Sequence, residues 1–249
     1  MIRKYIVYPI LRLARRALYQ LGFRATDSYD DRTLALAIVR GDVRALSERA
    51  ESDCLLTHDC FQKAGATKVL DFGGGGGRHG FQYLDGDLAT WAVVETPSMV
   101  RACSENLAHP SLSFHESISE AAGLHGIFDV VHASSSLQYT PDPEEFLRQL
   151  VGLHTKRLIL EKLVVTESDS AVSLTQYSFL SDNLPAREKV GNPLSITKYG
   201  LIAIPESELL RQAGEQYRVV DSWEDPPQSH LPLHRRLKQI GLILEAKND

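Results

Sequence analysis

The sequence has 249 residues, which suits one large α/β domain with a substantial core. With 43% apolar and 24% charged residues, its composition excludes disordered, collagen-like and disulfide-scaffold proteins. The net charge is −5, and residues 1–26 contribute six positive and no negative charges, so the rest of the chain holds −11. An acidic body argues against nucleic acid as a partner.

Cysteine spacing and the apolar runs indicate the compartment. Cys54, Cys60 and Cys103 are widely spaced and form no C-x-x-C pair, which predicts reduced thiols in a cytoplasmic protein and no metal site. The longest early apolar run, Tyr5–Leu11, is much shorter than the ~20 residues of a membrane span and lacks a small-residue cleavage site. We therefore expect neither a transmembrane anchor nor a signal peptide.

Residues 1–27 are predicted to form a basic amphipathic N-terminal helix. An apolar stripe recurs at helical spacing, at Ile6, Ile10, Leu13, Ala14, Ala17 and Leu21. Three arginines fall on the opposite face, at Arg12, Arg15 and Arg16. Two interpretations stay open: the stripe packs on the domain, or residues 1–24 make a peripheral contact with an anionic membrane at its inner face, basic face toward the headgroups. Residues 29–63 are expected to be helical, with an interruption near Gly41–Asp42.

Residues 28–249 are predicted to form one domain in which strands alternate with helices. The strands are expected at Lys68–Phe72, Ala89–Glu95, Leu112–His115, Phe128–Ala133 and Arg157–Leu163. Helix starts are expected at Thr96-Pro97, at Asp142-Pro143 with Glu145 completing a capping box, and at Pro205-Glu206, whose helix ends at Gly214. Such alternation predicts a Rossmann-like, doubly wound, mostly parallel sheet.

The C-terminal part breaks this alternation. Tyr217–Trp223 and Gln239–Ala246 are strands with no helix between them, which predicts an antiparallel pair. The expected result is a seven-stranded sheet with an antiparallel C-terminal strand, preceded by N-terminal helices. A dinucleotide-binding fold would instead repeat parallel strand–helix units to its end.

The segment 69–80 carries the strongest chemical signal. An apolar strand ends in Asp71-Phe72 and continues into five glycines, where the backbone must turn and a ligand can approach closely. Gly75–Gly80 also fits G-x-G-x-x-G, so an NAD-dependent oxidoreductase is one alternative. Glu95 ends the next strand, where a carboxylate can accept hydrogen bonds from ribose hydroxyls in either fold.

The register Asp71-x-Gly73-x-Gly75-x-Gly77 resembles motif I of the class I S-adenosylmethionine-dependent methyltransferases. The resemblance implies that Asp71 anchors the amino-acid end of S-adenosylmethionine and that the three glycines pass under its methionine portion. It also implies cofactor contacts from Glu95 and Thr96 and an adenine contact from Ser117, with Glu116 as the alternative. Small residues after the fourth strand, Ser134 and Ser135, are expected beside the donor.

A narrower resemblance adds an acceptor class. Four segments are similar to methyltransferases found among bacterial genes for surface-polysaccharide synthesis: Val69–Gly77, Val94-Glu95-Thr96-Pro97, Ser135–Tyr139 with Asp142-Pro143, and Thr175-Gln176. This resemblance implies O-methylation of a sugar or another surface-glycan precursor, as a small molecule or linked to lipid. The sequence departs from the expected pattern at Arg78-His79 and Glu161-Lys162.

A sugar hydroxyl needs a general base, and the sequence offers several. His79, His132, Tyr139 and Glu161 are the candidates, Gln138 and Gln176 are candidate substrate contacts, and metal-independent transfer is predicted. The long segment 164–204 is interpreted as an acceptor-side lid or, alternatively, a structural hairpin. Because spacing singles out no base, a non-catalytic S-adenosylmethionine-binding module is a further alternative.

Overall fold

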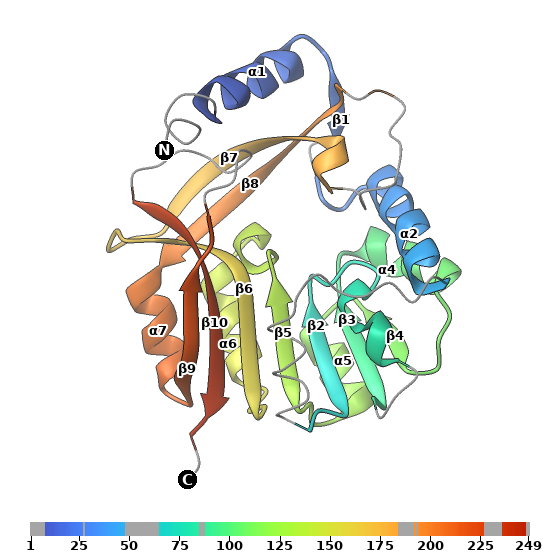
Figure 1. The fold of residues 1–249 in the computed structure, drawn as a ribbon, viewed down its shortest axis with the longest axis vertical. Helices are drawn as coiled ribbons and strands as arrows, with labels where there is room; N and C mark the ends of the chain where they lie inside the picture. The colour runs from blue at the N-terminus through green and yellow to red at the C-terminus, as the bar shows by residue number, and fades with distance from the viewer. Residues whose placement is uncertain are drawn as a thin grey trace.

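A computed structural model describes residues 8–26, 28–47, 65–84, 88–183, 192, 194–226 and 236–247. Its main sheet has the strand order β4-β3-β2-β5-β6-β10-β9 (Figure 1). The strands are β2 (Lys68–Phe72), β3 (Thr90–Val94), β4 (Leu112–His115), β5 (Val130–Ser134), β6 (Arg157–Thr166), β9 (Tyr217–Glu224) and β10 (Leu237–Ala246). All seven strands lie where the sequence predicts them, with ends that differ by up to three residues.

The directions of these strands define the fold class. β2, β3, β4, β5 and β6 pair in parallel. β10 runs antiparallel to β6 along its length, and β9 runs antiparallel to β10. The predicted Rossmann-like sheet with an antiparallel C-terminal strand is therefore confirmed. The NAD-dependent alternative required a parallel sixth strand in that place, so the topology opposes it.

Helices cover both faces of the sheet. One face carries α2 (Arg32–Ser47), the 3₁₀ helix η2 (Arg78–Tyr83) and α4 (Pro97–Asn106), and the other carries α5 (Ile118–His125), α6 (Pro143–Val151) and α7 (Glu206–Gly214). Successive strand residues enter opposite cores, because side chains alternate across a strand. Val69, for example, packs with the α2 and α4 face and Leu70 with the α5 and α6 face. Strands buried on both sides explain the continuous apolar runs in the sequence.

A smaller layer, which we call the cap, lies beyond one end of the main sheet (Figure 1). It contains α1 (Tyr8–Gln20), β1 (Arg24–Thr26), β7 (Val172–Phe179) and β8 (Ile196–Pro205). β7 and β8 form an antiparallel hairpin, β1 adds to β8 in parallel, and the end of β8 pairs with the carboxyl end of β6. Within the segment 164–204, β7 and β8 thus form a hairpin continuous with the main sheet. Strand β1, which precedes the boundary predicted at residue 27, pairs with β8.

Some local predictions were wrong. α2 runs through Gly41 and Asp42 without the predicted interruption, and residues 48–63 lie outside the described part of the chain. The helix that follows the glycines is a 3₁₀ helix. Thr96 makes no side-chain cap bond, although Pro97 begins α4 as expected. Asp142 does cap α6, but the Glu145 side chain bonds Arg148 and Gln149 instead of completing a capping box.

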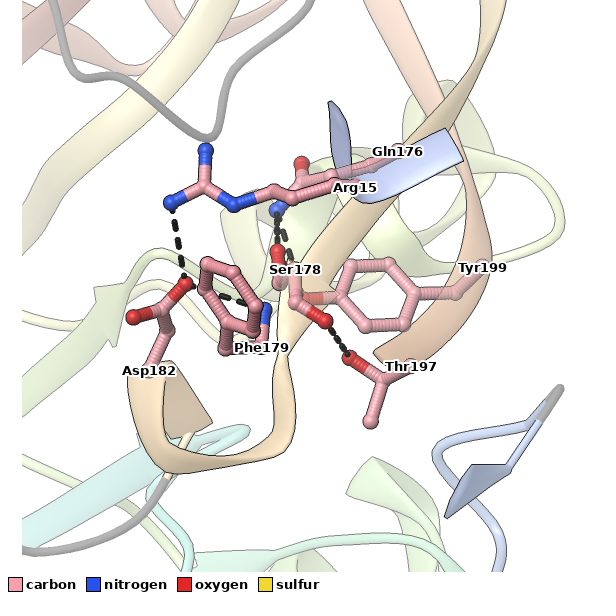
Figure 2. Close-up of polar contacts among 7 residues, drawn as sticks. All are labelled: Arg15, Gln176, Ser178, Phe179, Asp182, Thr197 and Tyr199. Atoms are coloured by element: carbon pink, nitrogen blue, oxygen red, sulfur yellow. Dashed lines mark hydrogen bonds and ion pairs between the residues drawn. The ribbon is translucent and has the colours of Figure 1, made fainter. Parts of the chain in front are cut away.

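The orientation of α1 differs from the first interpretation of its sequence. Arg15 is 5% exposed and its guanidinium pairs with Asp182 at 3.3 Å while lying over the Phe179 ring (Figure 2). Leu13 and Leu21 on the apolar stripe are 67% and 74% exposed. The face of α1 that bears Arg15 and Tyr19 therefore packs on the β7–β8 hairpin, and the idea that the stripe packs on the domain is wrong. Over the ranges described, no helix combines the length and apolar character needed to cross a membrane.

Candidate active site

The loop after β2 contains five glycines, and three take a left-handed backbone conformation. Gly73, Gly75 and Gly77 have φ values of 69°, 59° and 82°, which strain any residue with a Cβ. A Cβ on Gly73 would lie 2.2 Å from that of Ser136, whereas a Cβ on Gly75 would enter open space. Ser136 also donates a hydrogen bond to the Phe72 carbonyl at 2.7 Å. The loop is thus tightly seated at Gly73 and open at Gly75.

Glu95, directly after β3, connects the glycine loop to the start of α4. Its Oε1 accepts a hydrogen bond from the Gly75 N–H at 3.1 Å, and its Oε2 accepts one from the Thr96 N–H at 2.8 Å. Burial raises the pKa of Glu95, while the two N–H donors oppose that shift. The neighbouring Thr96 Oγ1 is buried and has no hydrogen-bond partner among the described residues. An orphaned hydroxyl beside a carboxylate suits a polar ligand.

A cavity of about 490 Å³ opens at these strand ends, and we call it the larger cavity. Its polar wall includes Glu95, Thr96, Glu116 and Ser135. Its apolar lining includes Phe72, Val94, Pro97, Met99 and Phe146. Ser117 is not among the lining residues, because its hydroxyl caps α5 by accepting from the Glu120 N–H. Of the two predicted adenine contacts, Glu116 lines this cavity and Ser117 does not.

A second space of about 270 Å³, the smaller cavity, adjoins the larger one and shares Ile38, Gly73 and Gly75 with it. Ionisable and polar groups line it: Asp42, Asp71, Arg78, His79 and Ser134. The two cavities together run along the glycine loop from Asp71 to Glu95. The structure thus brings together the two carboxylates on which the sequence interpretation depended.

Asp71 belongs to a buried charged network under the glycine loop. His132 on β5 contacts Asp71 Oδ1 through Nδ1 at 2.8 Å and Glu161 Oε2 on β6 through Nε2 at 3.1 Å. Trp91 Nε1 donates to Asp71 Oδ2 at 3.0 Å. Asp71 and His132 are fully buried, and Glu161 is 4% exposed. Parallel register makes this network possible, because Asp71 pairs with His132 on the neighbouring strand.

The pKa values follow from this geometry. Burial alone would lower the pKa of His132, but the adjacent carboxylates of Asp71 and Glu161 outweigh burial and raise it to about 9. Burial would raise the pKa of Asp71, but His132 and the Trp91 N–H lower it. The three groups therefore form an imidazolium held between carboxylates. His132 and Glu161 are engaged with each other, so neither is suited to accept a proton from an acceptor.

His79 behaves differently from His132. Burial lowers its pKa, and the charge of the nearby His132 lowers it further, so its imidazole is neutral near pH 7. It lines the smaller cavity, and its ring centroid lies 5.0 Å from that of His132. Of the four predicted bases, His79 is the one that combines a cavity position with a form able to accept a proton near pH 7.

A second, uncharged network lies within the cap, on strands β7 and β8 (Figure 2). The Tyr139 hydroxyl donates to Gln176 Oε1 at 3.1 Å, and Gln176 Nε2 donates to Ser178 Oγ at 3.1 Å and to the Tyr199 hydroxyl at 3.3 Å. Gln176 is 2% exposed and holds the Tyr139 hydroxyl in place, and its predicted contact with substrate stays a prediction. Burial raises the pKa of Tyr139, which disfavours the phenolate that a base would need.

Gln138 was also predicted to contact substrate, and the structure places it elsewhere. It is 1% exposed and its Nε2 donates to the Lys162 carbonyl at 3.2 Å. This bond joins the loop after β5 to β6 at Lys162, whose φ of 50° is left-handed. Gln138 therefore has a structural role in holding that loop.

Sequence reasoning missed two residues of the site, Asp42 and Tyr29. Asp42 on α2 is 3% exposed, and burial raises its pKa to about 6 while Arg78 and the Gly76 N–H oppose the shift. Tyr29 lines the larger cavity, with its ring centroid 4.5 Å from that of Tyr199 and 5.3 Å from that of Tyr139. Both precede β2 in segments without a recognisable motif. The sequence offered a signal for Asp42 only, as an acidic residue inside an amphipathic helix.

The described residues contain no group of three or more His, Cys, Asp or Glu side chains arranged to hold a metal ion. Metal-independent transfer stays a prediction. Of the three cysteines, Cys103 is buried and free, and the other two lie outside the described residues.

The strand order and the position of the glycine loop define the class I S-adenosylmethionine-dependent methyltransferase fold. No protein-family model and no curated protein matches the sequence. Among solved structures, the N-terminal domain of EvdMO1, crystallised in the presence of S-adenosylhomocysteine (SAH) and D-fucose, has a TM-score of 0.51 at 15% identity, covering 84% of this chain and 97% of that one.

A methyltransferase from Clostridium acetobutylicum, described as S-adenosylmethionine-dependent, gives a similar result. Its TM-score is 0.50 at 11% identity, and the match covers 77% of this chain and 89% of that one. At these identities the likeness establishes the fold.

Proposed function

We propose that this protein is an S-adenosylmethionine-dependent methyltransferase that O-methylates a sugar or a surface-glycan precursor. The observation that carries the proposal is the position of Glu95 beside the open Gly75, at the rim shared by two adjoining cavities. A dinucleotide would need room for a pyrophosphate where this chain has the Asp71 network. The lipid-linked form of the acceptor and a cytoplasmic location stay predictions.

The two cavities suit the two halves of the donor. In the larger cavity, Glu95 would accept hydrogen bonds from the ribose hydroxyls, and Met99 and Phe146 would pack against the purine. In the smaller cavity, Arg78 would face the donor's carboxylate and Asp71 lies on the side of its ammonium group. The orphaned Thr96 hydroxyl and the bare backbone at Gly75 support the same placement.

The donor supplies a methyl group already activated by the positive charge of its sulfonium. The chain's own residues then have to orient the acceptor and exclude water. His79 is the general base of the proposal, because its neutral imidazole lines the smaller cavity next to the donor's amino-acid end. His132 would keep Asp71 oriented from behind.

Three tyrosines support a sugar as acceptor. Tyr29 and Tyr139 line the larger cavity, and Tyr199 packs against both rings, with its centroid 5.4 Å from that of Tyr139. Aromatic faces with hydroxyl tips combine apolar contact with hydrogen bonding. The structural neighbour crystallised in the presence of D-fucose is in keeping with this choice.

Calorimetric titration with SAH and with NAD tests the donor. We expect SAH to bind, NAD to fail, and Glu95→Gln to weaken SAH binding roughly tenfold or more, since a ribose hydrogen bond to a charged group is lost. Glu105→Gln, at an exposed position of α4, makes the same change of charge and should bind as the wild type does. Binding of NAD in place of SAH would refute the proposal.

A non-catalytic binding module is the second candidate, because three of the four predicted bases are engaged elsewhere or unsuited. An acceptor screen with methyl-labelled donor separates the two. The methyltransferase proposal expects label transfer to a sugar hydroxyl, and His79→Gln should lower the transfer rate about 10²-fold or more without weakening SAH binding. Absence of transfer to every sugar tested, with SAH still bound, would favour the module.

A further inference from the structure

We propose that the outward face of α1 docks on an anionic lipid bilayer. The proposal starts from which side of this helix is buried. Arg15 and Tyr19 are 5% and 7% exposed, and both face the β7–β8 hairpin. Arg15 pairs with Asp182 and lies 5.0 Å from the centroid of Phe179 (Figure 2). The Tyr19 and Tyr177 ring centroids lie 5.3 Å apart. Polar and aromatic contacts, not the apolar stripe, thus hold α1 on the cap.

The opposite face is apolar and exposed along the whole helix and just past its end. Ile10, Leu13 and Leu21 are 60%, 67% and 74% exposed. Ala14 and Ala17, between them on the same face, are also exposed. This outward stripe follows helical spacing, so it is one continuous surface and not scattered single residues. An exposed stripe of this kind marks an interaction site.

The charge of the N-terminal segment indicates which kind of partner the outward stripe binds. Residues 1–26 carry six basic residues and no acidic one, and the rest of the chain has a net charge of −11. Arg16 on α1 is exposed, and Arg24 is exposed beyond the C-terminal end of the helix. A bilayer with anionic headgroups attracts this segment and repels the body, which orients the protein with α1 against the lipid.

A second copy of the chain fits the surface less well. Apposed α1 stripes would bring two basic segments together, and like charges side by side oppose association. Docking on an anionic bilayer meets no such repulsion, because the apolar residues of α1 enter the acyl boundary while its arginines reach the headgroups. This docking does not depend on the proposed methyl transfer.

Vesicle co-sedimentation of the full chain tests the proposal. We expect binding to phosphatidylcholine vesicles that contain about one third phosphatidylglycerol, weaker binding to pure phosphatidylcholine, and loss of binding at about 1 M salt. Leu13→Glu should lower the partition coefficient about tenfold or more, because a charge replaces an inserted apolar side chain. Arg16→Gln should lower it about fivefold.

The matched control is Ile127→Glu, which places the same charge at a residue that is 81% exposed after α5. It should bind vesicles as the wild type does, and urea unfolding should show that Leu13→Glu is as stable as the wild type. Equal loss in both glutamate variants, or no loss in Leu13→Glu, would overturn the proposal. Sedimentation equilibrium showing a dimer that Leu13→Glu dissociates, without vesicle binding, would assign the stripe to a second copy instead.

Discussion

The two buried polar networks of this protein differ in charge, and the difference separates the main sheet from the cap. Under the glycine loop, His132 lies between the carboxylates of Asp71 and Glu161. Within the cap, Gln176 connects neutral hydroxyl groups, including that of Tyr199. Removing one partner of a buried ion pair leaves an uncompensated charge and strongly lowers the free energy of unfolding. Removing one hydroxyl from a neutral network costs about one hydrogen bond. The charged network should therefore dominate stability and its pH dependence.

The largest effect is expected from His132→Ala. The substitution leaves two buried carboxylates without their cation, and the free energy of unfolding should fall by about 3–5 kcal/mol. Urea unfolding at pH 7 measures the change. His109→Ala, at a half-buried histidine whose ring accepts a hydrogen bond from the Ser111 N–H, should cost less than about 1 kcal/mol. A similar small loss in His132→Ala would mean that the network is not charged.

The pH dependence of stability comes next. The pKa of His132 rises from 6.5 to about 9 on folding, so its contribution is complete below pH 6.5 and is lost as the pH rises through about 9. The wild type should lose up to about 3 kcal/mol over this window relative to His132→Gln. Asp71 has the opposite sign: its lowered pKa stabilises the fold above its ordinary value of 3.8 and that contribution disappears in acid. Parallel urea titrations of both proteins would show the difference, and identical slopes would contradict it.

Gly74→Ala tests how closely the glycine loop sits on the charged network. The added Cβ would lie 2.2 Å from Asp71 Oδ2, so the loop or the carboxylate must move. We expect a loss of about 1–3 kcal/mol in the free energy of unfolding, together with weaker SAH binding. Gly123→Ala in α5 meets open space and should instead stabilise the protein by about 0.4–1 kcal/mol. Unchanged stability and binding in Gly74→Ala would show that the loop yields freely.

The smallest effect belongs to the neutral network. Tyr199→Phe removes a hydroxyl that donates to Ser178 Oγ at 3.0 Å and accepts from Gln176, which should cost about 1 kcal/mol. The cost should be equal at pH 6.5 and pH 9, because the network joins amide and hydroxyl groups and contains no carboxylate or imidazole. Tyr177→Phe on β7, the strand that pairs with the one holding Tyr199, is the control, since no hydrogen bond of its hydroxyl is found within the described residues. A cost that changes with pH would link the two networks.

Local sequence patterns located the parts of the site that lie at strand ends. Asp71 and Glu95 each follow an apolar run, and the glycines between them leave little choice of backbone conformation. Positions of this kind are predictable because parallel strands end at one edge of a sheet. The substrate contacts predicted for Gln138 and Gln176 stay predictions, since a motif reveals which residues lie near a site but not which neighbours bond their side chains.

The orientation of α1 shows the same limit on a larger scale. Its sequence places arginines and apolar residues on opposite faces, yet amphipathicity alone does not tell which face meets the protein. The buried face of α1 is set by contacts of Arg15 with Asp182 and Phe179, which lie more than 160 residues further along the chain. The hairpin offers an acid and an aromatic ring to Arg15, and these contacts turn the apolar stripe outward.

The sequence by itself determined the order of strands and helices, the antiparallel end of the sheet and the glycine loop beside Glu95, because all of these depend on residues close together in the chain. Only the tertiary structure decided that His132 pairs with Asp71 and Glu161, that Asp42 and Tyr29 enter the site, and that α1 presents its apolar face to the outside. Those outcomes depend on burial and pairing between distant segments, and no local pattern carries that information.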